Sequence, residues 1–336
     1  MLAFLHHFDP YAVQIGDQYG VRWYGLSYLA GFLATYWFIL WLIRRGRSPL
    51  SKTQAGDAVF WLAIATVLGG RLGYCLMYDP ALFIYFDDSF PFWGALAINR
   101  GGMSAHGGIA GVLLTCYLYG RKHKLPALHL ADICATSGAI GIFFGRIANF
   151  INGELVGRPC DPNLPWAVKF PQDILAWPEY EPQRLKDLAQ AVQLLGESST
   201  TWLDKVASNP LSGYVQHHLM KIVSAVQEGN HAVAEALQRV LLPRHPSQLY
   251  EAGMEGLLLF LACAAIWRRP RSPGLVSICF LTLYPLVRFV GEQFRMPDAQ
   301  IGYQLLGLTR GQWLSLFMLL VVMAGLKLLR RPARRS

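Results

Sequence analysis

The stretch VRWYGLSYLAGFLATYWFILWLI, residues 21–43, contains a single charged side chain, Arg22. About 20 consecutive apolar residues in a helix cross the roughly 30 Å hydrocarbon core of a bilayer. This run therefore predicts a membrane-spanning helix. The composition agrees, because 53% of the 336 residues are hydrophobic and only 15% are charged, against about 25% charged residues in typical soluble domains.

Six further apolar runs have a length that suits a membrane span, and they cover residues 58–77, 103–120, 130–151, 249–267, 274–294 and 313–329. Membrane spans of this kind fold as helices because lipid cannot satisfy backbone hydrogen bonds. We therefore predict an all-α integral membrane protein with about seven transmembrane helices.

Lysine and arginine are concentrated in alternate connections between the predicted helices. Short basic segments stay on the cytoplasmic side of a membrane. The pattern thus predicts that the N-terminus lies outside and the C-terminus inside. The basic residues are Arg44, Arg45, Arg47 and Lys52; Arg121, Lys122 and Lys124; Arg268, Arg269 and Arg271; and, in the tail, Lys327, Arg330, Arg331, Arg334 and Arg335.

The long connection, residues 152–248, then lies outside the cytoplasm. Its apolar residues at helical spacing predict a small extracytoplasmic head domain of amphipathic helices, as in Leu185, Leu188, Val192 and Leu195. Three regions follow from this organisation. They are residues 1–151, with an N-terminal extracytoplasmic segment and helices one to four; residues 152–248, the head with an extended helical insertion; and residues 249–336, with helices five to seven and a basic cytoplasmic tail.

Several classes of protein are disfavoured by what the sequence lacks. The first ten residues carry no lysine or arginine ahead of an apolar stretch, so we expect no cleaved signal peptide. Five of the six cysteines fall in apolar runs, which indicates no disulfide framework. The histidines show no metal-ligand spacing, and no phosphate-binding loop is present. We expect neither a metal nor another cofactor.

Polar residues inside the predicted spans gather at one depth. A charged side chain in a span costs a few kcal/mol and therefore normally faces a protein interior or a cavity. Placed on alternating helices, these residues all fall in the outer half of the membrane, which predicts one shared cavity. They are Tyr24, Arg71, His106, Arg146, Asn149, Tyr284, Arg288 and Glu292. The alternative is structural, with Arg288 and Glu292 as an ion pair or arginines reaching toward the interface.

His106 lies in the glycine-rich segment GGMSAHGG, residues 101–108. Glycine permits close approach of a backbone, so a lipid or a peptide could come near this histidine. Imidazole exchanges protons near neutral pH, although a single histidine in a membrane is often only a packed residue. Ser104 stands two residues away and points to a different side of a helix, which disfavours a serine hydrolase.

Six stretches together resemble the bacterial prolipoprotein diacylglyceryl transferase family. They are RWYGLSY (22–28), GGRLGY (69–74), NRGGMSAHGG (99–108), GRIANFINGELVGR (145–158), PRHPSQLYE (243–251) and RFVGEQFRMPDAQ (288–300). One departure from the family pattern is a polar, helix-prone segment between Phe170 and Leu242 that looks several tens of residues longer than usual.

The resemblance implies a multi-pass enzyme of the bacterial inner membrane with its active site toward the periplasmic face. Such an enzyme moves the diacylglyceryl group of phosphatidylglycerol to the lipobox cysteine of a prolipoprotein, forms a thioether and releases glycerol 1-phosphate. Its partners would be that lipid, the lipobox peptide and the bilayer, with no nucleic acid. The implied catalytic residues are His106, Arg146 and Arg288.

The implied chemistry suggests a role for each residue. His106 would take the thiol proton, although nearby arginines alone could also lower the thiol pKa. Forked guanidinium groups of Arg146 and Arg288 would hold the phosphate. The expected substrate-binding residues are Tyr24, Arg71, Asn149, Asn152, Glu154, Tyr284 and Glu292: Arg71 as a further phosphate ligand, Asn149, Asn152 and Glu154 for the glycerol hydroxyls, Tyr24 and Tyr284 to close the pocket, and Glu292 to orient Arg288.

Two rival functions fit the sequence less well. A secondary transporter for an organic anion would also place arginines in the membrane, but its site would lie near the midplane with counterparts on both sides. An intramembrane protease would need a nucleophile at helical spacing to a base, and the sequence offers none.

Overall fold

A computed structural model describes residues 3–15, 19–88, 91–98, 101–297 and 302–329 of the chain. The arginines of the predicted basic tail, at positions 330, 331, 334 and 335, lie outside the described residues. So do the ends of two of the family-like stretches, residues 99–100 and 298–300.

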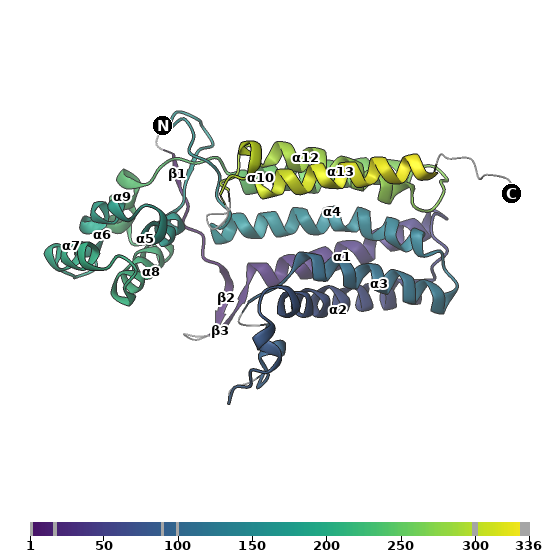
Figure 1. The fold of residues 1–336 in the computed structure, drawn as a ribbon, viewed down its shortest axis with the longest axis horizontal. Coiled ribbons are helices and arrows are strands. Elements are labelled where there is room, and N and C mark those ends of the chain that lie inside the picture. The colour runs from purple at the N-terminus through teal and green to yellow at the C-terminus, as the bar shows by residue number, and fades with distance from the viewer. Residues whose placement is uncertain (1–2, 16–18, 89–90, 99–100, 298–301, 330–336) are drawn as a thin grey trace. The chain divides into compact units, whose positions relative to one another are not determined.

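The chain is mostly helical, and a helix covers each of the seven predicted apolar runs (Figure 1). These helices are α1 (Trp23–Arg44), α2 (Lys52–Met77), α3 (Ala105–His123), α4 (Ala127–Asn152), the continuous run of α10 (Ser247–Glu251), η6 (Ala252–Leu258) and α11 (Leu259–Ile266), then α12 (Leu275–Gly291) and α13 (Arg310–Leu329).

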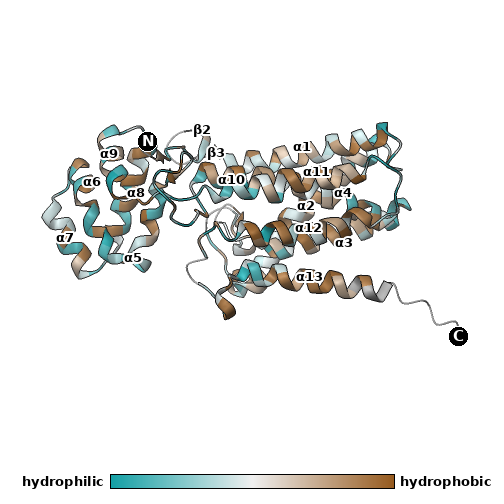
Figure 2. Cartoon of the chain, turned by 90° about the horizontal axis from the view of Figure 1, so that it is seen from above, coloured by the Kyte–Doolittle hydropathy of each residue, from teal (hydrophilic) through white to brown (hydrophobic). Residues whose placement is uncertain are grey.

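Four of these helices are long and apolar enough to cross a membrane, namely α1, α2, α4 and the run Ser247–Ile266. Shorter apolar helices cover Leu275–Gly291 and Arg310–Ala324. Figure 2 shows hydrophobic residues along the long helices. The helical, membrane-protein character is therefore confirmed, whereas the number of seven spans remains a prediction.

Shorter elements occupy the connections. The helices are α5 (Trp177–Tyr180), α6 (Ala189–Leu194), α7 (Ser199–Ser208), α8 (Gly213–Gln227) and α9 (His231–Val240), with 3₁₀ turns η1 (Pro80–Phe83), η2 (Gly94–Leu96), η4 (Pro171–Ala176), η5 (Pro182–Leu188) and η7 (Leu305–Gly307). The strands are β1 (Phe4–Leu5), β2 (Tyr11–Ile15), β3 (Tyr19–Arg22) and β4 (Val168–Lys169). β1 pairs in parallel with β4, and β2 pairs antiparallel with β3, which leads directly into α1.

Helix α2 begins six residues before its predicted apolar run, at Lys52 rather than residue 58. Ser51 caps it: the Ser51 side chain accepts a hydrogen bond from the Gln54 backbone N–H, and the Gln54 side chain accepts one from the Ser51 backbone N–H. Such a capping box stabilises a polar first turn. Because this first turn is polar, the apolar run in the sequence did not predict it.

The described chain forms two compact units, each assembled from segments far apart in the sequence. The first unit comprises Met1–Tyr28, Ile142–Gly256 and Tyr284–Ser336, and the second comprises Leu29–Gly141 and Leu257–Leu283.

In the second unit, glycines let α2 and α3 approach closely. A Cβ atom on Gly73 would lie 2.6 Å from the Gly107 Cα, and one on Gly69 would lie 2.5 Å from the Gly107 carbonyl oxygen. Gly69 and Gly73, like Gly107 and Gly111, are spaced four residues apart, which is the small-residue pattern of tightly packed membrane helices. The segment that carries His106 is thus pressed against α2.

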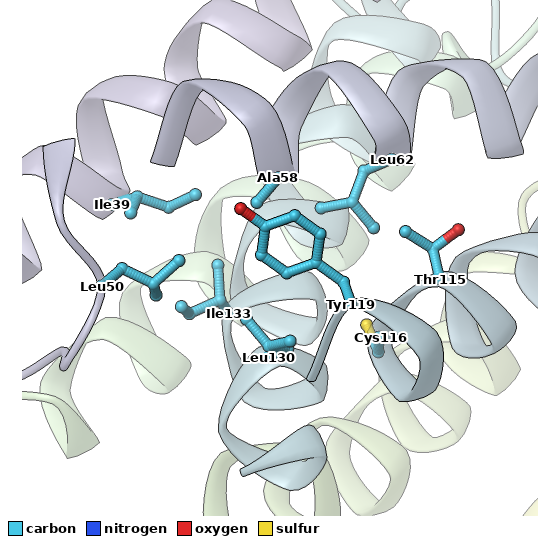
Figure 3. Close-up of a pocket in the computed structure, with 9 residues that line it drawn as sticks. All are labelled: Ile39, Leu50, Ala58, Leu62, Thr115, Cys116, Tyr119, Leu130 and Ile133. Carbon is cyan, nitrogen blue, oxygen red and sulfur yellow. The ribbon is translucent and has the colours of Figure 1, made fainter. Parts of the chain in front are cut away.

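The same unit contains an apolar pocket (Figure 3). Its walls are almost all hydrocarbon, and the hydroxyl of Tyr119 is engaged, since it donates to the Gln54 carbonyl at 2.9 Å. Apolar pockets of this kind stay dry. We therefore assign the pocket to packing. Its lining residues are Ile39, Leu50, Ala58, Leu62, Thr115, Cys116, Tyr119, Leu130 and Ile133.

Asp132 of α4, fully buried in the second unit, organises the start of α12. Its carboxylate accepts hydrogen bonds from the backbone N–H groups of Gly274 and Ser277, both at 2.8 Å, and pairs with Arg271 at 3.1 Å. Arg271 also stacks over the Trp267 ring at 3.3 Å. This arginine, which the sequence suggested as one of the basic residues of a connection, has a side chain only 6% exposed.

In the first unit, helices α5 to α9 enclose a hydrophobic core, which confirms that residues 170–242 are helix-rich. The predicted amphipathic spacing is correct, because Leu185, Leu188 and Val192 are buried and Leu195 packs against the core. The Trp202 indole donates to the Leu185 carbonyl at 2.9 Å. That these residues form an extracytoplasmic head domain remains a prediction.

His6 is buried in the first unit among aromatic rings. Its Nε2 lies 2.7 Å from the Phe150 carbonyl oxygen, and its ring meets Phe8, Phe150 and Phe170. The pKa of His6 is lowered to about 4, chiefly by burial and to a smaller extent by the neighbouring His7, while the hydrogen bond to Phe150 acts in the opposite direction. The imidazole is therefore neutral in the folded protein at neutral pH.

We predict that Gly107→Ala destabilises the protein, because a methyl group cannot fit against α2. Overpacking of this kind costs about 1–3 kcal/mol. Thermal unfolding in detergent measures the effect. The control is Gly138→Ala in α4, where, among the described residues, no heavy atom beyond the neighbouring backbone of the same helix lies within 4 Å of the added carbon. Equal unfolding temperatures for the two variants would contradict the close α2–α3 contact.

We also predict that acidification destabilises the first unit through His6. Below the unfolded-state pKa of about 6.5 the unfolded chain binds the proton and the folded chain does not, so stability falls as the pH drops from 6.5 toward 4, by up to about 3 kcal/mol. His6→Gln should show a smaller loss of melting temperature between pH 7.5 and 5 than wild type. His217→Gln, at an exposed position on α8, should behave like wild type.

Candidate active site

The last turns of α4 carry the first group of expected site residues. Asn149, buried on α4, donates through its side-chain amide to the Tyr24 hydroxyl in the first turn of α1. That hydroxyl lies 3.5 Å from a carboxylate oxygen of Glu154, whose backbone N–H bonds the Asn149 carbonyl at 3.0 Å. The structure thus brings together three of the expected substrate-binding residues, Tyr24, Asn149 and Glu154, and their binding of a substrate remains a prediction.

Two further properties of this group favour binding of a polar molecule. The buried Oδ1 of Asn152, the last residue of α4, has no hydrogen-bond partner among the described residues. Glu154 follows the helix and is exposed as a residue, yet loss of solvent around its carboxyl group raises its pKa. A buried acceptor and a partly desolvated carboxyl group suit the hydroxyl groups of a ligand.

A cluster of buried ion pairs lies one turn earlier on α4. Arg146 meets Glu251 at 3.0 Å and Glu255 at 3.3 Å. Arg288 of α12 meets the same two carboxylates, Glu255 at 3.1 Å and Glu251 at 3.4 Å. Both glutamate side chains are 0% exposed, whereas the arginines keep 14–15% exposure. The two guanidinium groups therefore share two carboxylates, and both arginine side chains remain partly exposed.

Arg288 has a third partner on its own helix. Its Nη2 lies 2.5 Å from Glu292, one turn further along, and Glu292 also accepts a hydrogen bond from the Thr309 hydroxyl at 2.8 Å. Arg295 lies 3.9 Å from Glu251 and 4.0 Å from Glu292. The ion pair between Arg288 and Glu292, an alternative that the sequence left open, is therefore present, and it belongs to a larger network.

The local backbone explains how the carboxylates reach the arginines. Residues Ala252–Leu258 form η6, a π-helical segment inside an otherwise α-helical run. Such segments are rare and are often found at functional sites. Gly256 allows η6 to lie against α4, because a Cβ atom there would be 2.6 Å from Phe143.

Glu251 and Glu255 are not among the site residues that the sequence predicts. Both fall within the apolar run 249–267, which predicts a membrane span. The signal was available, since two carboxylates four residues apart in an apolar helix are costly unless they are paired.

His106 and Arg71 belong to the second unit. His106 lies exposed in the first turn of α3. Arg71, only 4% exposed, donates to the backbone carbonyls of Gly94 at 2.6 Å and Ala95 at 3.0 Å. It also donates to Gly101 and Gly102. Convergence of His106 with Arg146 and Arg288, and phosphate binding by Arg71, remain predictions.

Membrane-length apolar helices that hold buried arginines and carboxylates are typical of integral membrane enzymes and transporters. Comparison with known proteins selects the enzymes. A family model described as "Prolipoprotein diacylglyceryl transferase" matches residues 10–328. The chain belongs to this family of transferases, which confirms the resemblance seen in the sequence.

Three similar proteins are each named phosphatidylglycerol--prolipoprotein diacylglyceryl transferase. The one from Bdellovibrio bacteriovorus is 51% identical over 321 residues, which cover 94% of this chain and 91% of that protein. The protein from Burkholderia ambifaria is 38% identical over 344 residues, with 98% of each chain covered. The protein from Rhodospirillum rubrum is 36% identical over 316 residues, with 93% and 89% covered.

We predict that Glu255→Gln destabilises the protein, because it removes the charge that both guanidinium groups share. Removing one partner from a buried ion pair costs roughly 3 kcal/mol or more, and the remaining carboxylates should limit the loss to about that value. The unfolding temperature in detergent is the measurement. Glu235→Gln, at an exposed position on α9, serves as the control. If both variants unfold at the wild-type temperature, the cluster does not stabilise the fold.

Proposed function

We propose that this protein transfers the diacylglyceryl group of phosphatidylglycerol to the lipobox cysteine of a prolipoprotein. Membership of the transferase family over residues 10–328 is the observation that carries the proposal. The shared Arg146–Arg288 cluster supports it, because two neighbouring, partly exposed guanidinium groups suit the phosphate of an anionic lipid.

The reaction replaces a carbon–oxygen bond with a carbon–sulfur bond, and the thiol proton passes to a base. The cysteine thiol loses its proton, and the sulfur attacks the glyceryl carbon that is esterified to phosphate. The carbon–oxygen bond then breaks, its electron pair moves to the phosphate oxygen, and glycerol 1-phosphate leaves. A thioether joins the diacylglyceryl group to the peptide. The protein must therefore receive a proton from sulfur and stabilise charge on the departing phosphate.

Arg146 and Arg288 serve the phosphate in this proposal. Charge that develops on the departing oxygen is stabilised best by donors already held in place. Glu251 and Glu255 hold both guanidinium planes, and Glu292 orients Arg288 from one helical turn away. The carboxylates thus fix the donors before the lipid arrives.

The Tyr24–Asn149–Glu154 group serves the free glycerol of the headgroup. The group offers amide, carboxyl and phenol groups within hydrogen-bond reach of one another, and the unpartnered Asn152 Oδ1 adds an acceptor. Such a set can bind both hydroxyl groups of the phosphatidylglycerol headgroup. A lipid whose headgroup carries a single hydroxyl would make fewer of these hydrogen bonds. Tyr24 and Tyr284 would close the pocket near the reacting carbon.

His106 acts as the base that takes the thiol proton. Its exposure at the start of α3 suits contact with a substrate. The alternative is that the arginines lower the thiol pKa sufficiently without a base.

We place the protein in the bacterial inner membrane with seven spans, the N-terminus outside and the C-terminus inside. Residues 1–151 and 249–336 supply the spans, and residues 152–248 form a periplasmic head. The distribution of basic residues supports this orientation. It puts the ends of α4 and α12 that bear the ion-pair cluster on the periplasmic side.

We predict that purified protein, incubated with phosphatidylglycerol and a lipobox peptide, yields a peptide heavier by one diacylglyceryl group. Mass spectrometry detects the product. A peptide with serine in place of the lipobox cysteine should remain unmodified, because its hydroxyl is far less acidic than a thiol. Uptake of labelled phosphoglycerol into vesicles without any thioether product would instead indicate a transporter.

We predict that Arg288→Lys lowers the rate of transfer about 10- to 100-fold. Lysine keeps the charge but loses the fork, and a charge-assisted hydrogen bond contributes about 1.5–3 kcal/mol. The initial rate of thioether formation measures the effect. Arg239→Lys, at an exposed position on α9, should leave the rate unchanged. Full activity of Arg288→Lys would contradict forked recognition of phosphate.

A further inference from the structure

The guanidinium group of Arg71 donates hydrogen bonds to the protein backbone. Its Nε donates to Ala95, its Nη2 to Gly94, and its Nη1 to both Gly101 and Gly102. A guanidinium group has five N–H donors, and four donor–acceptor contacts therefore leave little to offer a lipid phosphate. Its burial, at 4% exposure, points the same way.

The four carbonyls belong to two segments that precede the helix of His106. Gly94 and Ala95 form the η2 turn, and Gly101 and Gly102 lead into α3. Gly101 and Gly102 have φ angles of +82° and +77°, a conformation that favours glycine. A Cβ atom on Gly102 would lie 2.8 Å from the Arg71 Nη1, so glycine is also required for the close approach of the guanidinium group.

The first turn of α3 is held against α2 by neighbours of Arg71. The Ser104 backbone N–H donates to the Gly70 carbonyl at 2.8 Å, and the Ser104 hydroxyl caps α3 by accepting from the Gly107 N–H at 3.3 Å. Gly107 packs on Gly73. His106 lies between Ser104 and Gly107, with its backbone fixed on both sides and its side chain exposed.

We propose that Arg71 is a positioning residue for His106 and not a ligand of the lipid phosphate. It ties the segments before α3 to α2 and thereby fixes the turn that presents the imidazole. The inference rests on the proposed function, in which His106 takes the thiol proton. It replaces the phosphate-binding role that the sequence suggested for Arg71.

A substitution at position 71 can distinguish the positioning of His106 from the binding of phosphate. A lysine at position 71 would keep the charge that attracts a phosphate, but it cannot reach four carbonyls spread around a planar fork. A displacement of about 1 Å in a catalytic group can lower a rate about 100-fold. Positioning therefore requires arginine itself, whereas simple charge attraction does not.

The experiment measures thioether formation by the full-length enzyme as a function of phosphatidylglycerol concentration. For Arg71→Lys and Arg71→Gln we expect kcat to fall at least tenfold in both, with KM for the lipid changed less than twofold. Arg121→Lys, at the exposed far end of α3, is the control and should match wild type. A several-fold higher KM that Arg71→Lys largely rescues would overturn the inference, because it would indicate a phosphate ligand.

A double-mutant cycle with His106→Gln provides the decisive readout. If Arg71 acts through His106, Arg71→Lys should cause no further loss in the His106→Gln background. Additive losses would overturn the inference. An unchanged rate and pH profile for His106→Gln alone would overturn both the inference and the assignment of the base, whereas thioether formation by the wild-type enzyme would still support the proposed function.

A second variant covers the case in which the Arg71 variants fail to fold. Gly102→Ala keeps the guanidinium group but displaces the carbonyl that it binds. We expect the same signature of lower kcat, unchanged KM and no added loss with His106→Gln. Wild-type kinetics in folded Gly102→Ala would overturn the inference.

Discussion

The carboxylate of Glu255 lies between two guanidinium groups at a place that water does not reach. Removing an isolated charge from water costs several kcal/mol, so each member of this cluster depends on its partners. Three glutamates, Glu251, Glu255 and Glu292, balance three arginines, Arg146, Arg288 and Arg295. The balance joins the end of α4, the α10–η6 run and the end of α12. The interactions that hold these segments together are thus the same ones that orient the proposed phosphate ligands.

The helices were predictable because lipid leaves the backbone little choice. A long apolar run must satisfy its own N–H and C=O groups, and a helix does so locally. Every predicted run accordingly contains a helix. What could not be predicted depended on polar contacts. The early start of α2 depends on a capping box at Ser51, and the burial of Arg271 depends on Asp132, which lies far away in the sequence.

In the candidate site, too, some residues could be predicted from the sequence, whereas most of their polar contacts could not. The sequence suggested Arg288 and Glu292 as an ion pair, and two family-like stretches, residues 22–28 and 145–158, contain Tyr24, Asn149 and Glu154. Glu251 and Glu255 were not predicted, because they lie in a run whose overall hydrophobicity indicated only a membrane span. The sequence indicated Arg71 as a site residue but did not predict its partners. These partners are backbone carbonyl groups, which every residue carries.

The π-helical segment η6 makes the length of the chain matter as much as its composition. Glu251 and Glu255 lie about one turn apart where the helix is π-helical, and a π-helix has more residues per turn than an α-helix. Deleting one residue between them would turn Glu255 by roughly a quarter of a turn around the helix axis relative to Glu251. One of the two carboxylates would then leave the arginines, although every side chain in the cluster was still encoded. Relatives that keep this network should therefore vary in residue type along η6 but carry their insertions and deletions elsewhere.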